Sequence, residues 1–218
     1  PLTGRYFKCS VGGGWGLKAK MAGVDHLVIH GRAKKPVYIY IDVSKVEIRD
    51  ASFLLRKSVK ETNRILKEKL NNNSIDVACI GPAGESKVKY AGIMFSIYNT
   101  AARGGSGTVM ASKNLKAVVV NPDHGRVYVN DPENFYKYVK KSLEDTYNDS
   151  HSPVMYKYGT APDTDSMADV GLAPSYNFRR QTIENSYNFT GRYQIDKGYL
   201  KRRVGCGSCI IGCCLLYT

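Results

Sequence analysis

Four of the six cysteines lie in the last thirteen residues of the sequence. Cys206, Cys209 and Cys213 follow C-x2-C-x3-C spacing, and Cys214 comes directly after them. Thiolates this close repel one another, so they converge where a metal ion or an iron-sulfur cluster binds them. A disulfide or buried free thiols would be the plain structural alternative. The spacing favours a cubane cluster that takes three ligands here and a fourth from elsewhere.

A structural zinc site is the main rival to the cluster. Such a site usually needs a second pair of ligands. Among the four histidines only His26 and His30 have a suitable spacing, and they lie far from the cysteines in sequence. We therefore prefer iron-sulfur chemistry, and zinc remains the alternative.

Two glycine-rich segments could let backbone amides approach a ligand. Residues 12–16 include four glycines, and residues 101–117 combine glycines with the cations Arg103, Lys113 and Lys116. Glycines beside cations indicate a phosphate-binding loop. The second segment has neither the Gly-Lys-Ser/Thr ending of a Walker loop nor a dinucleotide fingerprint. Ordinary turns are the alternative for both.

The composition describes a folded chain without a membrane-spanning segment, at 218 residues and 43% hydrophobic. Thirty-two Lys and Arg against 19 acids give a net charge of +13, which favours polyanions. The charge is spread along the chain, so cofactor phosphates explain it as well as nucleic acid does. The isolated Cys9 and Cys79 suit a reducing, cytoplasmic location. Because it starts at Pro1 and stops soon after the cysteines, we interpret the chain as part of a longer polypeptide.

Hydrophobic patterns predict a strand-rich first part and a helical second part. Ser58 and Glu61 form a capping box that should start a helix ending near residues 71–73. Asp131 should cap a second helix, and the composition changes near Gly125. We predict domains over residues 1–125 and 126–218. The predicted strands are 27–29, 37–41, 46–49, 75–80, 118–120 and 127–129, with 37–41 and 46–49 forming a hairpin.

Short motifs follow one another along nearly the whole chain. The most specific are residues 102–105, residues 112–117 and the final cysteine motif. The others are residues 1–4, 12–16, 22–25, 35–41, 47–52 and 80–85. Taken together, in this order and spacing, they resemble the tungsten-containing aldehyde ferredoxin oxidoreductase family.

The resemblance implies an α+β chain. Its N-terminal domain would have two β-sheets and few helices, and would cradle two molybdopterin-type cofactors that chelate one tungsten or molybdenum. The start of a mainly helical domain would follow and ligate a 4Fe-4S cluster. The parent enzyme would oxidise a small aldehyde to a carboxylic acid and pass electrons to ferredoxin or a ferredoxin-like acceptor. The missing N- and C-terminal parts of the same protein would complete it, a homo-oligomer is possible, and neither membrane nor nucleic acid is an expected partner.

The resemblance also implies a set of site residues. Backbone carbonyls near Ser10 and Thr100 would hold an Mg2+ ion that bridges the pterin phosphates. Asn99 stands where an Arg can face a phosphate, which weakens binding unless Arg103 compensates. Other departures are Ser10 in place of Asn, and Ile210 in place of Pro. No catalytic acid or base is implied in this segment. The implied cofactor-binding residues are Ser10, Gly12, Gly13, Asn99, Thr100, Arg103, Gly104 and Gly105, and the implied metal ligands are Cys206, Cys209 and Cys213.

Two other functions remain open from the residues: a basic zinc-binding module for nucleic acid and a small iron-sulfur electron carrier. Metal content would separate all three. The preferred function makes one further demand on the fold. Residues 12–16 and 103–107 should lie on the same side of one domain, because they would bind two related cofactors.

Overall fold

The computed structural model describes residues 4–160 and 163–216. Contacts divide the chain into two compact units, Pro1–Tyr128 and Val129–Thr218, here called unit 1 and unit 2. Both contain helices and strands, which confirms the α+β class. The predicted domain boundary after residue 125 stays a prediction.

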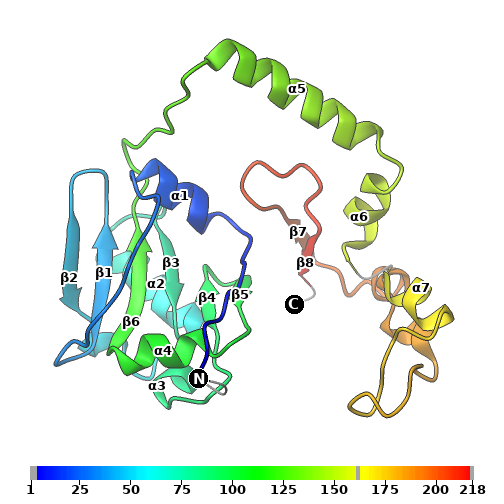
Figure 1. The fold of residues 1–218 in the computed structure, drawn as a ribbon, viewed down its shortest axis with the longest axis horizontal. Coiled ribbons are helices and arrows are strands. Elements are labelled where there is room, and N and C mark those ends of the chain that lie inside the picture. The colour runs from blue at the N-terminus through cyan, green and yellow to red at the C-terminus, as the bar shows by residue number, and fades with distance from the viewer. Residues whose placement is uncertain (1–3, 161–162, 217–218) are drawn as a thin grey trace. The chain divides into compact units, whose positions relative to one another are not determined.

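Unit 1 is built on one six-stranded mixed sheet with the order β2-β1-β6-β3-β4-β5 (Figure 1). β1 and β6 run parallel, and the other neighbouring strands are antiparallel. β6 therefore lies near the middle of the sheet, with β2 and β5 at its edges. The strands are β1 Val37–Ile41, β2 Val46–Asp50, β3 Asp76–Cys79, β4 Ile93–Phe95, β5 Asn99–Ala101 and β6 Leu115–Val120.

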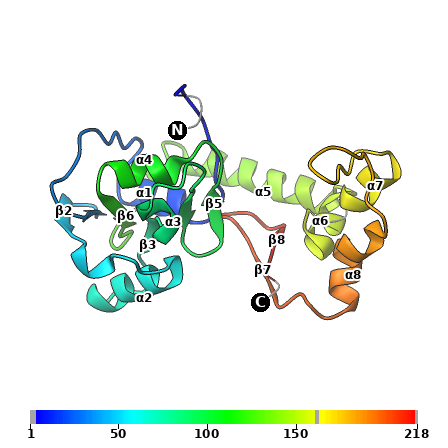
Figure 2. The same cartoon turned by 90° about the horizontal axis from the view of Figure 1, so that it is seen from below.

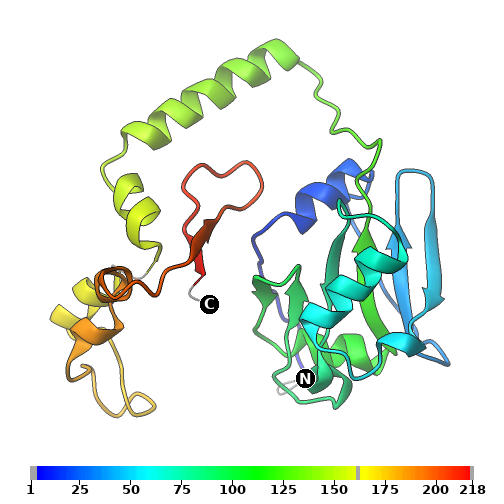
Figure 3. The same cartoon turned by 180° about the vertical axis from the view of Figure 1, so that it is seen from behind.

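Helices cover both faces of this sheet. Figure 2 shows α1 and α4 on one face and α2 on the other, and Figure 3 shows α2 from its own side. The central strands are buried on both faces because their successive side chains point to opposite sides. Val118 packs in a cluster with Met110 of α4, whereas Val119 packs in a second cluster with Leu66 of α2. The helical segments of unit 1 are α1 Trp15–Met21, η1 Ser52–Leu54, α2 Val59–Lys69, α3 Pro82–Glu85 and α4 Ser106–Ser112.

Local sequence signals in unit 1 produce the expected elements. The hairpin of β1 and β2 forms with Ile39 opposite Ile48. The capping box of α2 is complete: the Glu61 amide donates to Ser58 Oγ at 3.2 Å, and the Ser58 amide donates to Glu61 Oε2 at 2.9 Å. Two orphan amides at the helix start are thus satisfied.

Three expectations about the sheet are wrong. Residues 27–29 form no strand: Val28 is 83% exposed, while Ile29 packs on the core from an extended loop. Residues 127–129 form none either, since Val127 and Tyr128 are exposed and nothing buries them. The two sheets implied for the first domain are one sheet among the described residues, because β4 pairs with β3 and so extends the first sheet.

The described residues of unit 2 form helices and one short hairpin, β7 with β8. Asp131 caps α5 as expected, its carboxylate accepting a hydrogen bond from the Asn134 amide at 3.1 Å. α5 contains no buried residue. The elements are α5 Pro132–Asn148, α6 Ser152–Tyr158, α7 Asp163–Asp169, η2 Ser186–Phe189, α8 Gly191–Asp196, β7 Arg202–Val204 and β8 Cys214–Leu216.

Candidate cofactor cradle and cysteine loop

In unit 1, each glycine-rich segment lies against residues that closely precede the other one. Gly13 has φ +95°, and a Cβ built on it would lie 2.6 Å from Asn99 Oδ1, at the start of β5. Gly104 has φ +75°, and a Cβ there would lie 2.1 Å from Phe7 Cδ1. A side chain at either position would therefore both strain the backbone and collide with the facing segment. We call residues 10–14 together with residues 99–105 the cofactor cradle.

The predicted cofactor-binding residues all lie in this cradle, with different exposure. Ser10 and Gly12 are exposed on the first segment. Thr100 and Arg103 are exposed on the second, where Thr100 Oγ1 donates to the Ile93 carbonyl at 3.3 Å. Gly105, at φ +69°, leads into α4. The arrangement agrees with the expectation that the two segments lie on one side of the domain.

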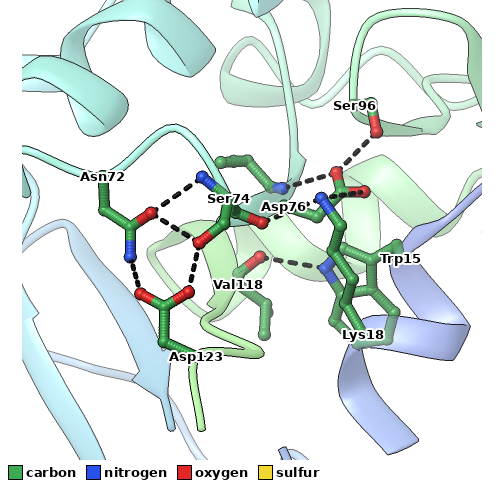
Figure 4. Close-up of polar contacts among 9 residues, drawn as sticks. Trp15, Lys18, Asn72, Ser74, Asp76, Ser96, Val118 and Asp123 are labelled. Carbon is green, nitrogen blue, oxygen red and sulfur yellow. Dashed lines mark hydrogen bonds and ion pairs between the residues drawn. The ribbon is translucent and has the colours of Figure 1, made fainter. Parts of the chain in front are cut away.

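Sequence reasoning missed a polar group beside the cradle. Asp76 begins β3, is 6% exposed, and accepts a hydrogen bond from Ser96 Oγ. Lys18 of α1 lies on its other side, as Figure 4 shows. The signal was present, because an acid followed by the apolar run Val77 to Ile80 is rarely buried without partners.

The cysteine motif occupies the loop of the β7–β8 hairpin, residues 205–213, which we call the cysteine loop. The loop is tight: the Cys209 amide donates to the Cys206 carbonyl at 3.0 Å. A Cβ on Gly205 would lie 3.0 Å from the Cys209 carbonyl oxygen, and Gly212 has φ +59°. Glycine at these two positions thus lets the backbone fold closely around the thiols.

The four thiols of this region differ in exposure. Cys209 is exposed, and Cys206, Cys213 and Cys214 are partly buried. Burial, together with the neighbouring Cys206 and Cys213, raises the pKa of the Cys214 thiol. Within residues 4–160 and 163–216, no three or more His, Cys, Asp or Glu side chains are arranged to hold a metal ion. A 4Fe-4S cube makes a different demand on geometry, because each thiolate binds a separate iron.

Arg203, in β7 directly before the cysteine loop, binds the last turn of α6. Its guanidinium donates to the carbonyls of Tyr156 at 2.7 Å and Lys157 at 3.2 Å, in the last turn of α6. The same group stacks 4.8 Å from the centre of the Tyr156 ring. These hydrogen bonds satisfy carbonyl groups at the C-terminal end of the helix. Arg203 and Tyr156 also line a cavity of about 780 Å³, together with Ile210 and Ile211.

Across the described part of the chain, no helix has both the length and the apolar character needed to span a membrane.

The family models match both units. Residues 1–122 match the aldehyde ferredoxin oxidoreductase N-terminal domain, and residues 137–217 match domains 2 and 3 of that enzyme. The first match alone spans more than half of the chain. The chain therefore belongs to the aldehyde ferredoxin oxidoreductase family, which confirms the resemblance seen in the sequence.

Individual relatives agree with the family match. The tungsten-containing aldehyde ferredoxin oxidoreductase of Pyrococcus horikoshii is 42% identical over 217 residues, which are 98% of this chain and 35% of the relative. That of Pyrococcus furiosus is 40% identical with the same coverage. The aliphatic sulfonate oxidoreductase WOR-like subunit of Pyrococcus furiosus is 34% identical over 200 residues, 84% of this chain and 31% of the relative. The chain thus spans about a third of the length of these relatives.

A solved structure shares the fold. The active site complex BamBC of benzoyl coenzyme A reductase, in complex with 1,5-dienoyl-CoA, aligns with a TM-score of 0.68 and 30% sequence identity. The alignment covers 96% of this chain and 34% of that chain.

Proposed function

We propose that this chain is part of an enzyme that oxidises aldehydes to carboxylic acids at a tungsten bis-pterin centre. The observation that carries the proposal is the close approach of Gly13, in the first glycine-rich segment, to Asn99, two residues before the second segment, in the domain that matches the family's N-terminal model. Tungsten is preferred over molybdenum because the relatives at 40% and 42% identity are named tungsten-containing.

We propose an aldehyde rather than another substrate because of the sequence identities to the relatives. The aldehyde enzymes are 40% to 42% identical to this chain, against 34% for the sulfonate oxidoreductase subunit and 30% for the benzoyl coenzyme A reductase complex. The reaction adds one oxygen from water to the aldehyde carbon and releases two protons and two electrons. When bound, the tungsten bis-pterin centre supplies the oxygen-transfer and redox chemistry.

Unit 1 would bind and orient the cofactor. Glycine at positions 13 and 104 keeps side chains out of the cradle, so backbone groups can approach pterin and phosphate atoms. Arg103 is exposed and forms no hydrogen bond or ion pair with another described residue, so it would be free to face a phosphate where Asn99 lacks the charge. Carbonyl groups near Ser10 and Thr100 would hold the bridging Mg2+.

Unit 2 would hold the 4Fe-4S cluster through Cys206, Cys209 and Cys213. Thiolate is the ligand such clusters prefer, and the glycines of the cysteine loop allow the tight fold described above. The fourth ligand would come from another part of the parent protein. The cluster would pass the two electrons one at a time to ferredoxin or a similar acceptor.

Metal analysis of the anaerobically purified full-length protein tests the proposal. We expect tungsten, iron and sulfide, and aldehyde-dependent reduction of ferredoxin or a low-potential dye. Cys209→Ser should lose iron and sulfide, whereas the matched variant Cys214→Ser should keep them. Tight stoichiometric zinc without sulfide would instead support the zinc-module alternative and refute the oxidoreductase.

A further inference from the structure

Asp76 is a buried acid that the proposed chemistry has not used. It is 6% exposed at the first position of β3, and its Oδ1 accepts hydrogen bonds from its neighbour's amide, Val77 N, at 2.9 Å and from Ser96 Oγ. A buried carboxylate is retained only where partners stabilise its charge. The groups that contact Asp76 are therefore held in place by their interactions with its carboxylate.

One partner of Asp76 is the turn that leads into the cradle. Besides its hydroxyl bond to Asp76, Ser96 donates its amide to the Val77 carbonyl at 2.8 Å and accepts from Asn63 Nδ2 at 3.1 Å. Ser96 also has φ +55°, a conformation that such bonds must maintain. β5, with Asn99, starts three residues later. The position of Asn99 thus depends on a turn fixed by three hydrogen bonds.

The other partner of Asp76 is the segment opposite. A Cβ on Gly14 would lie 3.5 Å from Asp76 Oδ2, and Lys18 Nζ lies 3.9 Å from the same oxygen. Lys18 also donates to the Ser74 carbonyl at 2.8 Å, and Trp15 Nε1 donates to the Val118 carbonyl at 3.4 Å (Figure 4). These two bonds fix the start of α1 immediately after Gly13, and the Lys18 ion pair is the contribution that Asp76 adds to them.

We propose that Asp76 is a positioning residue for the cofactor cradle, holding the Ser96 turn and the Gly14–Lys18 segment so that Gly13 and Asn99 face each other. This inference rests on the proposed function, since it assumes that a pterin cofactor binds against these two segments. The carboxylate is buried, and we assign it no contact with substrate or cofactor. It acts by fixing two backbone segments that approach from opposite sides, as outer groups do around many metal sites.

The variants separate the hydroxyl bond from the charge. Ser96→Ala removes the hydroxyl donor, Asp76→Asn keeps an acceptor oxygen but loses the charge facing Lys18, and Asp76→Ala loses both. Asp50 offers a matched control at the opposite edge of the sheet, because it accepts from Ser52 N at 3.1 Å and Ser52 Oγ at 2.7 Å in an exposed setting. Ser52→Ala and Asp50→Asn are therefore the control substitutions.

The experiment uses the full-length, anaerobically purified protein and measures tungsten and pterin retained per polypeptide over time, well below the unfolding midpoint. We expect Asp76→Ala to release the cofactor about tenfold faster than wild type, and the release rates of Ser96→Ala and Asp76→Asn to lie between those of wild type and Asp76→Ala. Both control variants should match wild type. The double variant Ser96→Ala/Asp76→Ala should be no worse than Asp76→Ala, because Ser96 acts through the carboxylate.

Two negative results have different meanings. A wild-type protein without tungsten or pterin would overturn the proposed function and this inference with it. A loaded wild type whose Ser96→Ala and Asp76→Asn variants release cofactor no faster would overturn the positioning role alone. If Asp76 variants do not fold, Ser96→Ala decides the matter by itself, since Ser96 is only partly buried.

Discussion

The two units bury their side chains very differently. Unit 1 packs two hydrophobic clusters, one on each face of its sheet, and Leu54, Leu66 and Val119 are 0% exposed. In unit 2 the described buried side chains are few, such as Ala173 and Thr190. A unit with a two-sided core carries its own stability, whereas a unit of exposed helices depends on further contacts.

Charge follows the same division. Residues 1–128 contain 21 Lys and Arg against nine Asp and Glu, and residues 129–218 contain 11 against ten. The basic character of the chain thus belongs to unit 1, where the cofactor cradle lies. This distribution suits cofactor phosphates at least as well as nucleic acid.

The apolar residues of α5 show what unit 2 requires. Phe135 is 56% exposed, Tyr138 68% and Leu143 39%. Side chains of this kind at helical spacing normally pack against a neighbour. The described contacts leave this face exposed, and the chain spans about a third of the length of its relatives.

The largest expected contrast is in thiol reactivity. Burial raises the pKa of Cys79 in unit 1 from 9.0 to about 12, whereas Cys209 in unit 2 is exposed. The raised pKa alone lowers the thiolate fraction at pH 8 by roughly a factor of 1,000. At pH 8 we expect alkylation of the native, metal-free chain to modify Cys209 at least about 1,000-fold faster than Cys79. Mass spectrometry of the labelled peptides measures both rates. Comparable rates would mean that unit 1 opens as readily as unit 2.

Core truncation should give the next largest contrast. Leu66→Ala, in a fully buried site of unit 1, should lower the free energy of unfolding by about 2–5 kcal/mol. Leu143→Ala, the same change on α5, should stay within about 0.5 kcal/mol. Denaturant unfolding of the 218-residue chain measures both. A large loss for Leu143→Ala would show that unit 2 has a core of its own.

High pH should weaken unit 1 through Cys79. Its folded pKa of about 12 lies above the ordinary value of 9.0, so the stabilising contribution is complete below pH 9 and is lost as pH rises from 9 to 12. The free energy of unfolding should fall by about 1.4 kcal/mol from pH 8 to pH 10 through this group. Cys79→Ala should remove that part of the decline, and an unchanged pH profile would contradict it.

Helix caps should give the smallest contrast. Ser58→Ala removes the capping box of α2 and should lower the unfolding free energy of unit 1 by about 1 kcal/mol. Asp131→Ala removes the cap of α5 and should reduce helix content by circular dichroism without changing unit 1 unfolding. The comparison fails if Asp131→Ala destabilises unit 1 to the same extent.

Features encoded locally could be predicted from the sequence. The Ser58 capping box needs only residues three apart, and the β1–β2 hairpin needs only a short turn between alternating apolar residues. The C-x2-C-x3-C spacing alone identified the cysteine loop as a candidate metal site. Its binding of a cluster stays a prediction.

Features that depend on distant contacts could not be predicted in this way. Asp76 and Ser96 are 20 residues apart, and neither type nor spacing predicts their bond. Residues 27–29 have strand composition, but whether a strand forms depends on a partner in the fold rather than on the segment itself. The contact of Gly13 with Asn99 likewise exists only once the sheet is assembled.

The central place of β6 has a consequence for how unit 1 folds. β6 is the last strand of unit 1 along the chain, yet it pairs with both β1 and β3. Pairing with β1 closes a loop from Ile41 to Leu115, and such long-range parallel pairing is slow to form. During synthesis, residues 1–114 emerge before β6, so the apolar sides of β1 and β3 that pair beside it are still exposed. Unit 1 therefore becomes a folded domain only when residue 120 has left the ribosome, and the cradle segments gain their fixed positions at that same late step.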